Sequence, residues 1–303
     1  MKDYPMNLIE FEKEFGTEEQ CRNYLFKLRW PDGYRCPHCD HNEAWDLNDK
    51  LFKCKRCGYQ TTVIAGTIFQ DTHKPLTLWF RAIWHITSQK TGASALGLQR
   101  VLGLGSYRTA WTWLHKLRRA MIRPGRDKLH GIVEVDEAFI GAPGVGGKRG
   151  RGAENKVLIA IAVEVNDKKI GRIRIGVIKD ASSESLHPFV EECVEKGSVI
   201  ISDGWRGYNG LAKKGYSEEI HKKKNETDES FLPHVHTVIS LLKRWLLGTL
   251  QGSCSDEHFK YYLDEYCFRF NRRTSKSRGM LFYRLLQNAV VLQPTAYKEI
   301  ISK

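Results

Sequence analysis

Two pairs of cysteines constrain the N-terminal part of this 303-residue chain more than any other feature. The stretch "CPHC" places Cys36 and Cys39 on one turn, and "CKRC" places Cys54 and Cys57 on another. Four thiolates spaced in this way can bind one zinc ion tetrahedrally. We therefore predict a zinc ribbon over residues 31–68, with Zn²⁺ as a structural ion, after a helical segment at residues 1–30. Whether the ribbon contacts DNA or neighbouring parts of its own chain stays open.

The charge of the chain indicates a polyanionic partner. The formal net charge is +13 and the isoelectric point is about 9.3, so nucleic acid is the first candidate, although a basic surface also serves solubility. The apolar run "VLIAIAV" at 157–163 is too short to span a bilayer, and the N-terminus lacks the pattern of a secretion signal. We therefore expect a cytoplasmic protein without a membrane partner. The remaining scattered cysteines suit a reducing compartment.

Residues 72–125 have the pattern of a helix-turn-helix. The turn is "GLG" at 103–105, and the helix after it has one apolar stripe, formed by Ala110, Leu114, Leu117 and Met121. The second helix of such a unit can enter the major groove of DNA. An ordinary helical hairpin with a solvated basic face is the alternative. The basic side chains that we expect to contact DNA here are Arg108, Lys116, Arg118 and Arg119.

Residues 130–250 read as an α/β layer with a mixed sheet. Short β-branched segments predict strands at 131–141, 155–165, 169–180 and 197–205. A helix capped by Ser185, with Pro188 in its first turn, is expected between the last two. The Gly- and Arg-rich segment 141–155 is expected to contact the DNA backbone or to be a hairpin tip. Its basic residues are Lys148, Arg149 and Arg151.

Two aspartates have the positions of metal ligands. Asp136 lies within one predicted strand, and Asp203 ends another. Carboxylates from neighbouring strands can hold Mg²⁺, and a two-metal site suits phosphodiester cleavage. Glu134 and Glu137 compete with Asp136; Glu134 shares its strand face, and Glu137 points to the opposite face.

A histidine on a later helix completes this candidate site. The helix is expected to begin at Pro233 and to run to about residue 249. His236 and Lys243 are seven residues apart and share one face, whereas His234 points away from Lys243. We therefore expect His236 to face the metals and Lys243 to reach a substrate phosphate. Carboxylates of the segment "KKKNETDES" are the alternatives to His236, namely Glu226, Asp228 and Glu229.

Residues 255–303 are predicted to form a helical tail. Its motif "FRFNRR" ends with Arg272 and Arg273, which could contact DNA phosphates. The alternative is a helix packed on the core with a solvated basic end.

The combination of these motifs resembles the bacterial insertion-sequence transposases of the ISXO-two-like group, insertion-sequence family fifteen-ninety-five. The resemblance covers "CPHC…CKRC", "LGLGSYRTAWTWLHKLRRAM", "VEVDEAFIG", "ISDGWRGY" and "YLDEYCFRFNRR". It implies a multidomain α+β and α/β protein with a zinc ribbon, a helix-turn-helix and an RNase H-like mixed-sheet catalytic core of DDE type. Asp136 and Asp203 match the family's two aspartates, His236 its variable third position and Lys243 its lysine.

The resemblance also implies a function. Such a chain is expected to bind the terminal inverted repeats of an element and its target DNA, as a homo-oligomer associated with the nucleoid. It is expected to cleave and join DNA strands with Mg²⁺ or Mn²⁺. Because histidine offers nitrogen where Mg²⁺ prefers oxygen, Mn²⁺ or an additional ligand is an alternative at that position. The rival functions are a catalytically inactive zinc-ribbon and helix-turn-helix regulator, and an RNase H-like nuclease or resolvase.

Overall fold

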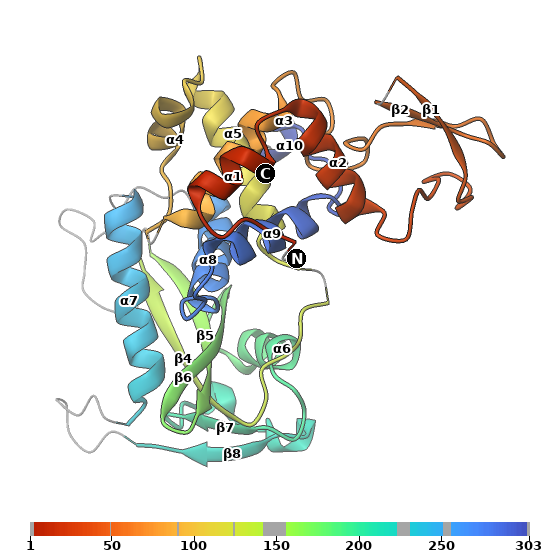
Figure 1. Ribbon diagram of the computed structural model, residues 1–303. Helices are drawn as coiled ribbons and strands as arrows, with labels where there is room; N and C mark the ends of the chain where they lie inside the picture. The colour runs from red at the N-terminus through yellow and green to blue at the C-terminus, as the bar shows by residue number, and fades with distance from the viewer. Residues whose placement is uncertain are drawn as a thin grey trace. The chain divides into compact units, whose positions relative to one another are not determined.

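The computed structural model describes residues 3–48, 50–89, 91–123, 125–141, 156–222, 231–250 and 256–301 (Figure 1). These residues belong to two compact units. The first combines Met1–Arg123 with Ser275–Lys303, and the second is Pro124–Thr274. No helix in the described ranges is both long and apolar enough to cross a membrane.

The first unit begins with two helices and a small antiparallel sheet. Helix α1 spans Leu8–Glu14 and α2 spans Glu18–Arg29, and strands β1 (Ala44–Leu47), β2 (Leu51–Cys54) and β3 (Gln60–Thr61) pair in that order. Phe52 of β2 packs against Phe26 and Trp30, with ring centroids 5.3 and 5.7 Å apart. Aromatic packing thus joins the sheet to the end of α2.

A group of helices completes the first unit. Helices α3 (Leu76–Ser88), α4 (Ala95–Leu102) and α5 (Tyr107–Ala120) follow the ribbon, and α9 (Arg278–Ala289) and α10 (Tyr297–Ile301) come from the chain's end. Gly103 ends α4 in the left-handed region (φ 60°), which a glycine adopts without strain. The four residues of the predicted apolar stripe on α5 are all buried. A tight turn between two helices therefore lies where the sequence predicts one.

The second unit is built on a five-stranded mixed sheet. Its strands are β4 (Ile132–Ile140), β5 (Val157–Asn166), β6 (Lys169–Val177), β7 (Val199–Ser202) and β8 (Ser217–Ile220), in the order β6-β5-β4-β7-β8. Strand β5 is antiparallel to β4 and β6, whereas β7 is parallel to β4 and β8. The four strands predicted from sequence are present, and β8 is an additional one.

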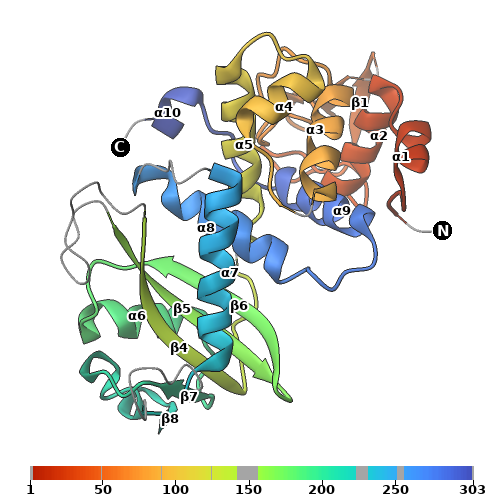
Figure 2. The same cartoon turned by 90° about the vertical axis from the view of Figure 1, so that its left-hand side faces the viewer.

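Helices cover both faces of this sheet. Helix α6 (Ser183–Cys193) packs on one face, and α7 (Pro233–Leu250) and α8 (Asp256–Phe270) pack on the other (Figure 2). Short 3-10 helices, η1 (Arg206–Tyr208) and η2 (Ala212–Lys214), connect β7 to β8. Because β5 is covered on both faces, its run from Leu158 to Glu164 is buried throughout. This arrangement explains the continuous apolar sequence there.

Helix α6 begins earlier than predicted. Ser182, not Ser185, is its N-cap residue, and Pro188 lies inside the helix rather than in its first turn. Asp180 causes the early start, because its Oδ1 accepts hydrogen bonds from the Ser182 backbone N–H and the Ser185 hydroxyl (3.1 and 2.8 Å). The cap assigned to Ser185 is therefore wrong.

The end of α8 binds the edge strand β6. Asn271 accepts a hydrogen bond from the Ile173 N–H (2.7 Å) and donates one to the Ile173 carbonyl (3.1 Å). Arg273 donates to the carbonyls of Gly171 (3.2 Å) and Ile170. The guanidinium of Arg273 is thus engaged within the fold.

A buried ion pair on β5 yields a stability prediction. Glu164 is 3% exposed and accepts hydrogen bonds from Nη2 and Nε of Arg172 (2.7 and 3.0 Å). Burial raises the pKa of Glu164, but Arg172 and the His130 N–H outweigh it and lower the pKa from 4.5 to about 2. We expect Glu164→Gln to lower the free energy of unfolding by about 1–3 kcal/mol at pH 7. Because the folded pKa is depressed, this stabilisation is present above about pH 4.5 and is lost toward pH 2. Urea titrations at pH 7 and pH 2.5 measure it, and Glu192→Gln, at an exposed position, is the control.

A carboxyl group on α8 has the opposite pH dependence. Burial raises the pKa of Asp264 from 3.8 to about 6, although Arg126 and Lys260 lower it. Because the folded pKa is raised, the stabilisation from proton uptake is present below about pH 4 and is lost as the pH rises through 6. We expect the free energy of unfolding of Asp264→Asn to exceed that of the parent by about 1–3 kcal/mol at pH 8. At pH 4 we expect no such increase. Thermal unfolding at the two pH values measures this difference. An equal effect at both would contradict the assignment.

Candidate metal centres and nucleic-acid interface

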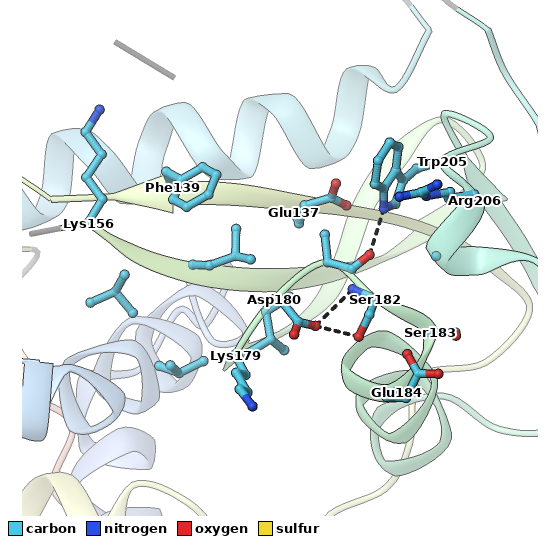
Figure 3. A pocket seen from close by; sticks show the side chains of 16 residues that line it. Glu137, Phe139, Lys156, Lys179, Asp180, Ser182, Ser183, Glu184, Trp205 and Arg206 are labelled. Atoms are coloured by element: carbon cyan, nitrogen blue, oxygen red, sulfur yellow. Dashed lines mark hydrogen bonds between the residues drawn. The ribbon is translucent and has the colours of Figure 1, made fainter. Parts of the chain in front are cut away.

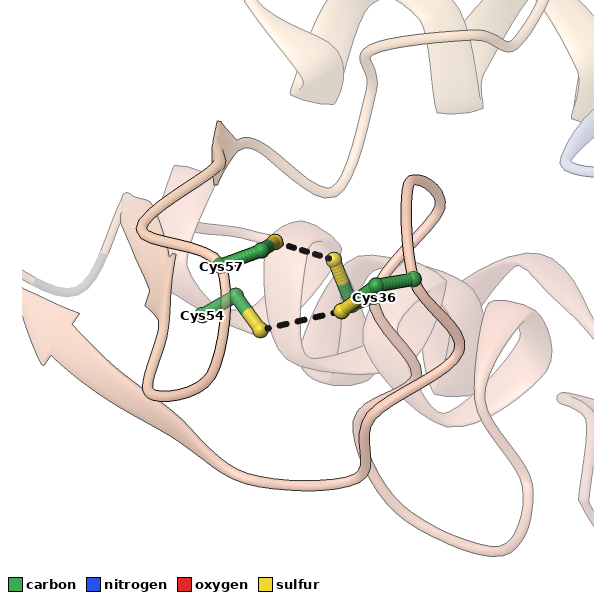
Figure 4. Close-up of side chains that lie close together, drawn as sticks. Cys36, Cys54 and Cys57 are labelled. Carbon is green, nitrogen blue, oxygen red and sulfur yellow. Dashed lines mark hydrogen bonds between the residues drawn. The ribbon is translucent and has the colours of Figure 1, made fainter.

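The four cysteines of the ribbon lie together. Their sulfurs are all within 4.8 Å of one another, with 3.7 Å between Cys36 and Cys57 and 3.6 Å between Cys39 and Cys54 (Figure 4). Four sulfurs at about 2.3 Å from a tetrahedral zinc ion lie about 3.8 Å apart. The thiols therefore fit zinc with little rearrangement.

The same backbone turn presents each pair of thiols. The carbonyl of Cys36 accepts from the Asp40 N–H (2.9 Å), and that of Cys54 accepts from the Gly58 N–H (3.0 Å). Asp40 and Gly58 both adopt positive φ angles, 58° and 70°. The two turns have the same hydrogen-bond pattern, so the sulfurs point into one space from two sides.

Cys36 and Cys39 perturb each other's pKa values. Although burial raises it, backbone N–H groups of His38 and Cys39 lower the pKa of Cys36 to about 6. A backbone N–H of His41 lowers the pKa of Cys39, but burial and the surrounding thiols raise it to about 12. Thiolates, not thiols, are the ligands of zinc, and a bound divalent cation favours that form.

The second unit places Asp136 on β4 and Asp203 directly after the last residue of the neighbouring strand β7. Strands β4 and β7 are parallel, and Glu134 is in register with Ile201. Asp136 follows Glu134 by two residues, and Asp203 follows Ile201 by two residues. Asp136 is partly exposed, with 17% of its side chain accessible. Both aspartates therefore lie two residues beyond the last paired positions of β4 and β7.

Asp203 is fixed by the turn that follows it. Its Oδ1 accepts a hydrogen bond from the Trp205 N–H (2.8 Å). Gly204 adopts a φ of 81°, and a Cβ there would lie only 2.7 Å from Cγ2 of Ile220. The motif "DGW" thus requires glycine for both conformation and space.

Tyr208 links the carboxylates of this region. It is 4% exposed and donates a hydrogen bond to Oε2 of Glu137 (2.9 Å). Burial, together with the negative charges of Glu137, Asp136 and Asp203, raises the pKa of Tyr208 well above its usual value. The phenol therefore interacts electrostatically with all three carboxylates. Glu137 is engaged on the face opposite to Asp136.

Helix α7 places His236 at Asp136. The His236 Nε2 lies 3.4 Å from Oδ2 of Asp136, and 29% of the histidine side chain is exposed. Val235, Val238 and Leu242 are buried against the sheet, while Lys243 is exposed. Lys243 lies seven residues after His236 on the same helix.

The three candidate ligands are spaced more widely than the thiols. Among the described residues, the four cysteines are the group of three or more ligand atoms that lie within 4.8 Å of one another. Coordination of one cation by Asp136, Asp203 and His236 together would therefore require side-chain rotation. The two carboxylates are ligands of the kind that Mg²⁺ or Mn²⁺ takes, whereas the imidazole is not a preferred ligand of Mg²⁺.

A second histidine of α7 contacts Glu134. The His234 Nδ1 lies 2.6 Å from Oε1 of Glu134, and its Nε2 lies 3.2 Å from the Lys168 carbonyl. Burial lowers the pKa of His234, but Glu134 and the carbonyl of Lys168 outweigh it and raise the pKa. Both ring nitrogens face oxygen acceptors, and the imidazolium form satisfies both.

A cavity of about 900 Å³ lies beside the Asp203 turn, on the α6 side of the sheet (Figure 3). Phe139 and Trp205 line it, with Lys179 and Arg206 among the charged residues. The Trp205 indole N–H donates to the Ala181 carbonyl (2.7 Å) and ties the turn to the segment that leads into α6. Trp205 thus helps to hold Asp203 in place.

The predicted DNA contacts have different environments. Arg108 is exposed, and its guanidinium lies 3.7 Å from the centre of the Tyr297 ring. Lys116 donates to the Ile68 carbonyl (3.4 Å), and Arg119 is half-buried. Arg118 is 2% exposed, so its expected position on a DNA-facing surface is not what the structure has. The loop residues Lys148, Arg149 and Arg151, and the alternatives Glu226, Asp228 and Glu229, lie outside the described residues.

Arg272 is another of the residues predicted to contact DNA. It donates to the Phe268 carbonyl (3.1 Å), and its guanidinium lies 4.2 Å from the centre of the Phe268 ring. The side chain of Arg272 therefore packs on the C-terminal end of α8.

The sequence predicts a different role for Glu134 and no role for Tyr208 or Asn271. Glu134 is a candidate metal ligand in the sequence, yet its carboxylate accepts hydrogen bonds from the first turn of α7. Tyr208 and Asn271 gave no signal, because their partners are 71 and 98 residues away. For Glu134, the sequence signal is the alternating pattern of β4, which puts Glu134 and Asp136 on one face.

Comparison with known proteins identifies two segments. Residues 16–60 match the transposase zinc-ribbon domain, and residues 128–271 match the ISXO2-like transposase domain. An uncharacterized protein in transposable element ISH50 of Halobacterium salinarum is 25% identical over 259 residues, 77% of this chain and 85% of that protein. The predicted resemblance is thereby confirmed: the chain carries an ISXO2-like transposase domain preceded by a transposase zinc-ribbon domain.

Proposed function

We propose that this protein is a DNA transposase that binds the ends of an insertion sequence, cleaves them and joins them to target DNA. The observation that carries the proposal is the position of Asp136, 3.4 Å from His236 and, like Asp203, two residues beyond the last paired positions of β4 and β7, within the matched transposase domain. The strand order β6-β5-β4-β7-β8, with β5 antiparallel to its neighbours, is the order of an RNase H-like core and supports this assignment.

Asp136 and Asp203 would hold Mg²⁺ or Mn²⁺ as the first two acids of a DDE-type site. Divalent ions bound there supply charge that activates water and stabilises the leaving oxygen in phosphoryl transfer. The chain's contribution is to fix the carboxylates. The sheet register aligns their strands, and the Trp205 N–H orients Asp203. Such positioning is most of what a protein adds to phosphoryl transfer.

His236 and Lys243 would complete the site from α7. His236 serves as the third ligand or orients Asp136 through its Nε2. Lys243 is exposed on the same part of the helix and would bind a DNA phosphate as a point charge. The third position is a nitrogen donor, so we expect Mn²⁺ to support activity at least as well as Mg²⁺.

The reaction would consist of two displacements at phosphorus. In the first, water attacks the phosphorus at the element end and the bond to the 3′ oxygen breaks, leaving a 3′-OH. In the second, that hydroxyl loses its proton, attacks a phosphorus of the target strand and displaces the bridging oxygen. Neither step consumes a nucleotide cofactor, and one site performs both.

DNA recognition would come from the first unit. Helices α4 and α5 would serve as the helix-turn-helix, and the second of them exposes its N-terminal residues Tyr107 and Arg108. The N-terminal residues of a recognition helix are those that reach base edges in such motifs. With the zinc ribbon, they would bind terminal repeats, and the buried Arg118 takes no part.

The test uses the full chain with DNA that carries the repeats flanking its own gene. Nicking at the element end with a free 3′-OH, followed by joining to a plasmid, is the expected outcome with Mn²⁺ or Mg²⁺. A mobility shift without nicking would indicate the inactive regulator. Cutting without joining would indicate a nuclease or resolvase. Sedimentation of the DNA complex measures the expected homo-oligomer.

A further inference from the structure

Glu134 is a buried carboxylate that the proposed chemistry does not use. We propose that Glu134, together with His234, is a positioning residue that sets the rotation of α7 and so holds His236 against Asp136. Glu134 is 4% exposed on the central strand β4. A carboxylate in such a place is strongly destabilising unless hydrogen bonds compensate the loss of water.

Hydrogen bonds from the first turn of α7 compensate the buried carboxylate of Glu134. Oε2 of Glu134 accepts from the backbone N–H groups of His234 (2.9 Å) and Val235 (2.8 Å), and Oε1 faces the His234 ring at 2.6 Å. The first N–H groups of a helix lack partners within the helix, and that end carries partial positive charge. Glu134 therefore acts as an N-terminal cap that a strand supplies to a helix 100 residues later.

The ring of His234 extends the contact to a third element. Its Nε2 lies 3.2 Å from the carbonyl of Lys168, in the turn between β5 and β6. One side chain thus spans β4 and this turn. A ring fixed at both nitrogens leaves the beginning of α7 little freedom to rotate.

The position of His236 depends on this rotation. Each residue of an α-helix advances about 1.5 Å and turns about 100°, so a shift of one residue would move His236 away from Asp136. Apolar packing of Val238 and Leu242 holds α7 on the sheet, but such packing is not directional. Glu134 lies two residues before Asp136 on the same face of β4, about 7 Å along the strand. The cap and the site therefore share one rigid strand.

The activity test is a double-mutant cycle. Single-turnover cleavage of pre-bound end DNA with Mn²⁺ is expected to slow about 10- to 100-fold in Glu134→Gln, with DNA affinity within about twofold of the parent. In a His236→Asn background, the same change is expected to cost less than about threefold, because its effect passes through His236. An equal loss in both backgrounds, or an unchanged rate in Glu134→Gln, would overturn the proposal.

Glu164→Gln is the matched control. It also removes a buried, hydrogen-bonded carboxylate from this sheet, but its partners are Arg172 and His130 rather than α7. At a temperature where both variants are folded, we expect it to cleave at the parental rate. Should Glu134→Gln fail to fold, His234→Asn keeps both backbone bonds and is expected to slow cleavage about 3- to 10-fold. A parental rate of cleavage in that folded variant would refute the positioning role of the contact between Glu134 and His234.

A spectroscopic test separates this proposal from the proposed function. The activity test rests on the proposed function, whereas the spectroscopic test does not. In protein labelled with ¹³C at histidine Cε1, the His236 signal is assigned by its loss in His236→Asn. We expect this signal to shift in Glu134→Gln and to stay in place in Glu164→Gln, without DNA or metal. An unmoved signal in Glu134→Gln would overturn the positioning role. Absence of any cleavage by the parent protein, with the expected shift observed, would overturn only the proposed function.

Discussion

Replacing Asp136 or Asp203 with asparagine is expected to slow metal-dependent cleavage of end DNA by about 1000-fold or more. Loss of one carboxylate removes a ligand whose charge holds the cation, and a 1000-fold loss corresponds to about 4 kcal/mol of transition-state stabilisation. Asparagine keeps the shape and one acceptor oxygen, so the bond that each side chain accepts from the next residues can persist. We therefore expect the fold and the affinity for end DNA to be retained. Quantitative nicking assays and mobility shifts on the same samples measure the two properties.

The control for this experiment is Glu164→Gln. Glu164 belongs to the same unit, and its carboxylate accepts hydrogen bonds from Arg172 and the His130 N–H. Its loss is expected to affect stability alone. Cleavage at the parental rate by Asp203→Asn would contradict the DDE-type assignment, and cleavage by Asp136→Asn would leave Glu137 as the competing first acid.

Removal of zinc is expected to have the second large effect. Structural zinc sites contribute roughly 10–16 kcal/mol of apparent binding free energy at neutral pH, more than a ribbon of three short strands can supply by packing. Cys36→Ser or Cys54→Ser should abolish stoichiometric zinc binding, unfold residues 31–68 and lower affinity for end DNA by more than about tenfold. Metal analysis, amide NMR spectra and mobility shifts measure these three consequences.

Cys21→Ala is the control for the thiol substitutions. Cys21 is fully buried in α2 of the same unit, and its sulfur faces the Phe15 carbonyl rather than the ribbon. We expect this variant to bind one zinc ion per chain. A Cys36→Ser protein that still bound one zinc ion and kept a folded ribbon would show that another ligand replaces the thiolate.

Local sequence signals predicted the parts of the fold that depend on short spacings. The cysteine pairs predicted the ribbon, the apolar run at 157–163 predicted β5, and the helical period after Pro233 predicted α7. Each of these features is decided within one element. For this reason they could be derived without knowledge of the partner elements.

Features decided by distant partners could not be derived in the same way. Strand β8 is exposed at all four residues, so it shows no alternation, and only pairing with β7 makes it a strand. Arg118 looks like a solvated residue in the sequence but is buried. Asn271 looks like part of a basic motif, whereas its amide pairs with β6. The predicted domain limits are likewise refined by tertiary contacts, because α8 joins the sheet unit and α9 joins the helical one.

The pairing of Asn271 with Ile173 has a consequence for how copies of this chain can associate. A side-chain amide reproduces there the two bonds that a neighbouring backbone would make, and Arg273 occupies the carbonyls just before it. An incoming chain could not extend the sheet at this margin without first displacing both residues, a protection against uncontrolled strand addition. The opposite margin, β8, is four residues long and carries two glutamates, which disfavours the same event. Assemblies on DNA should therefore form through helices and loops, and the catalytic sheet should remain discrete in each copy.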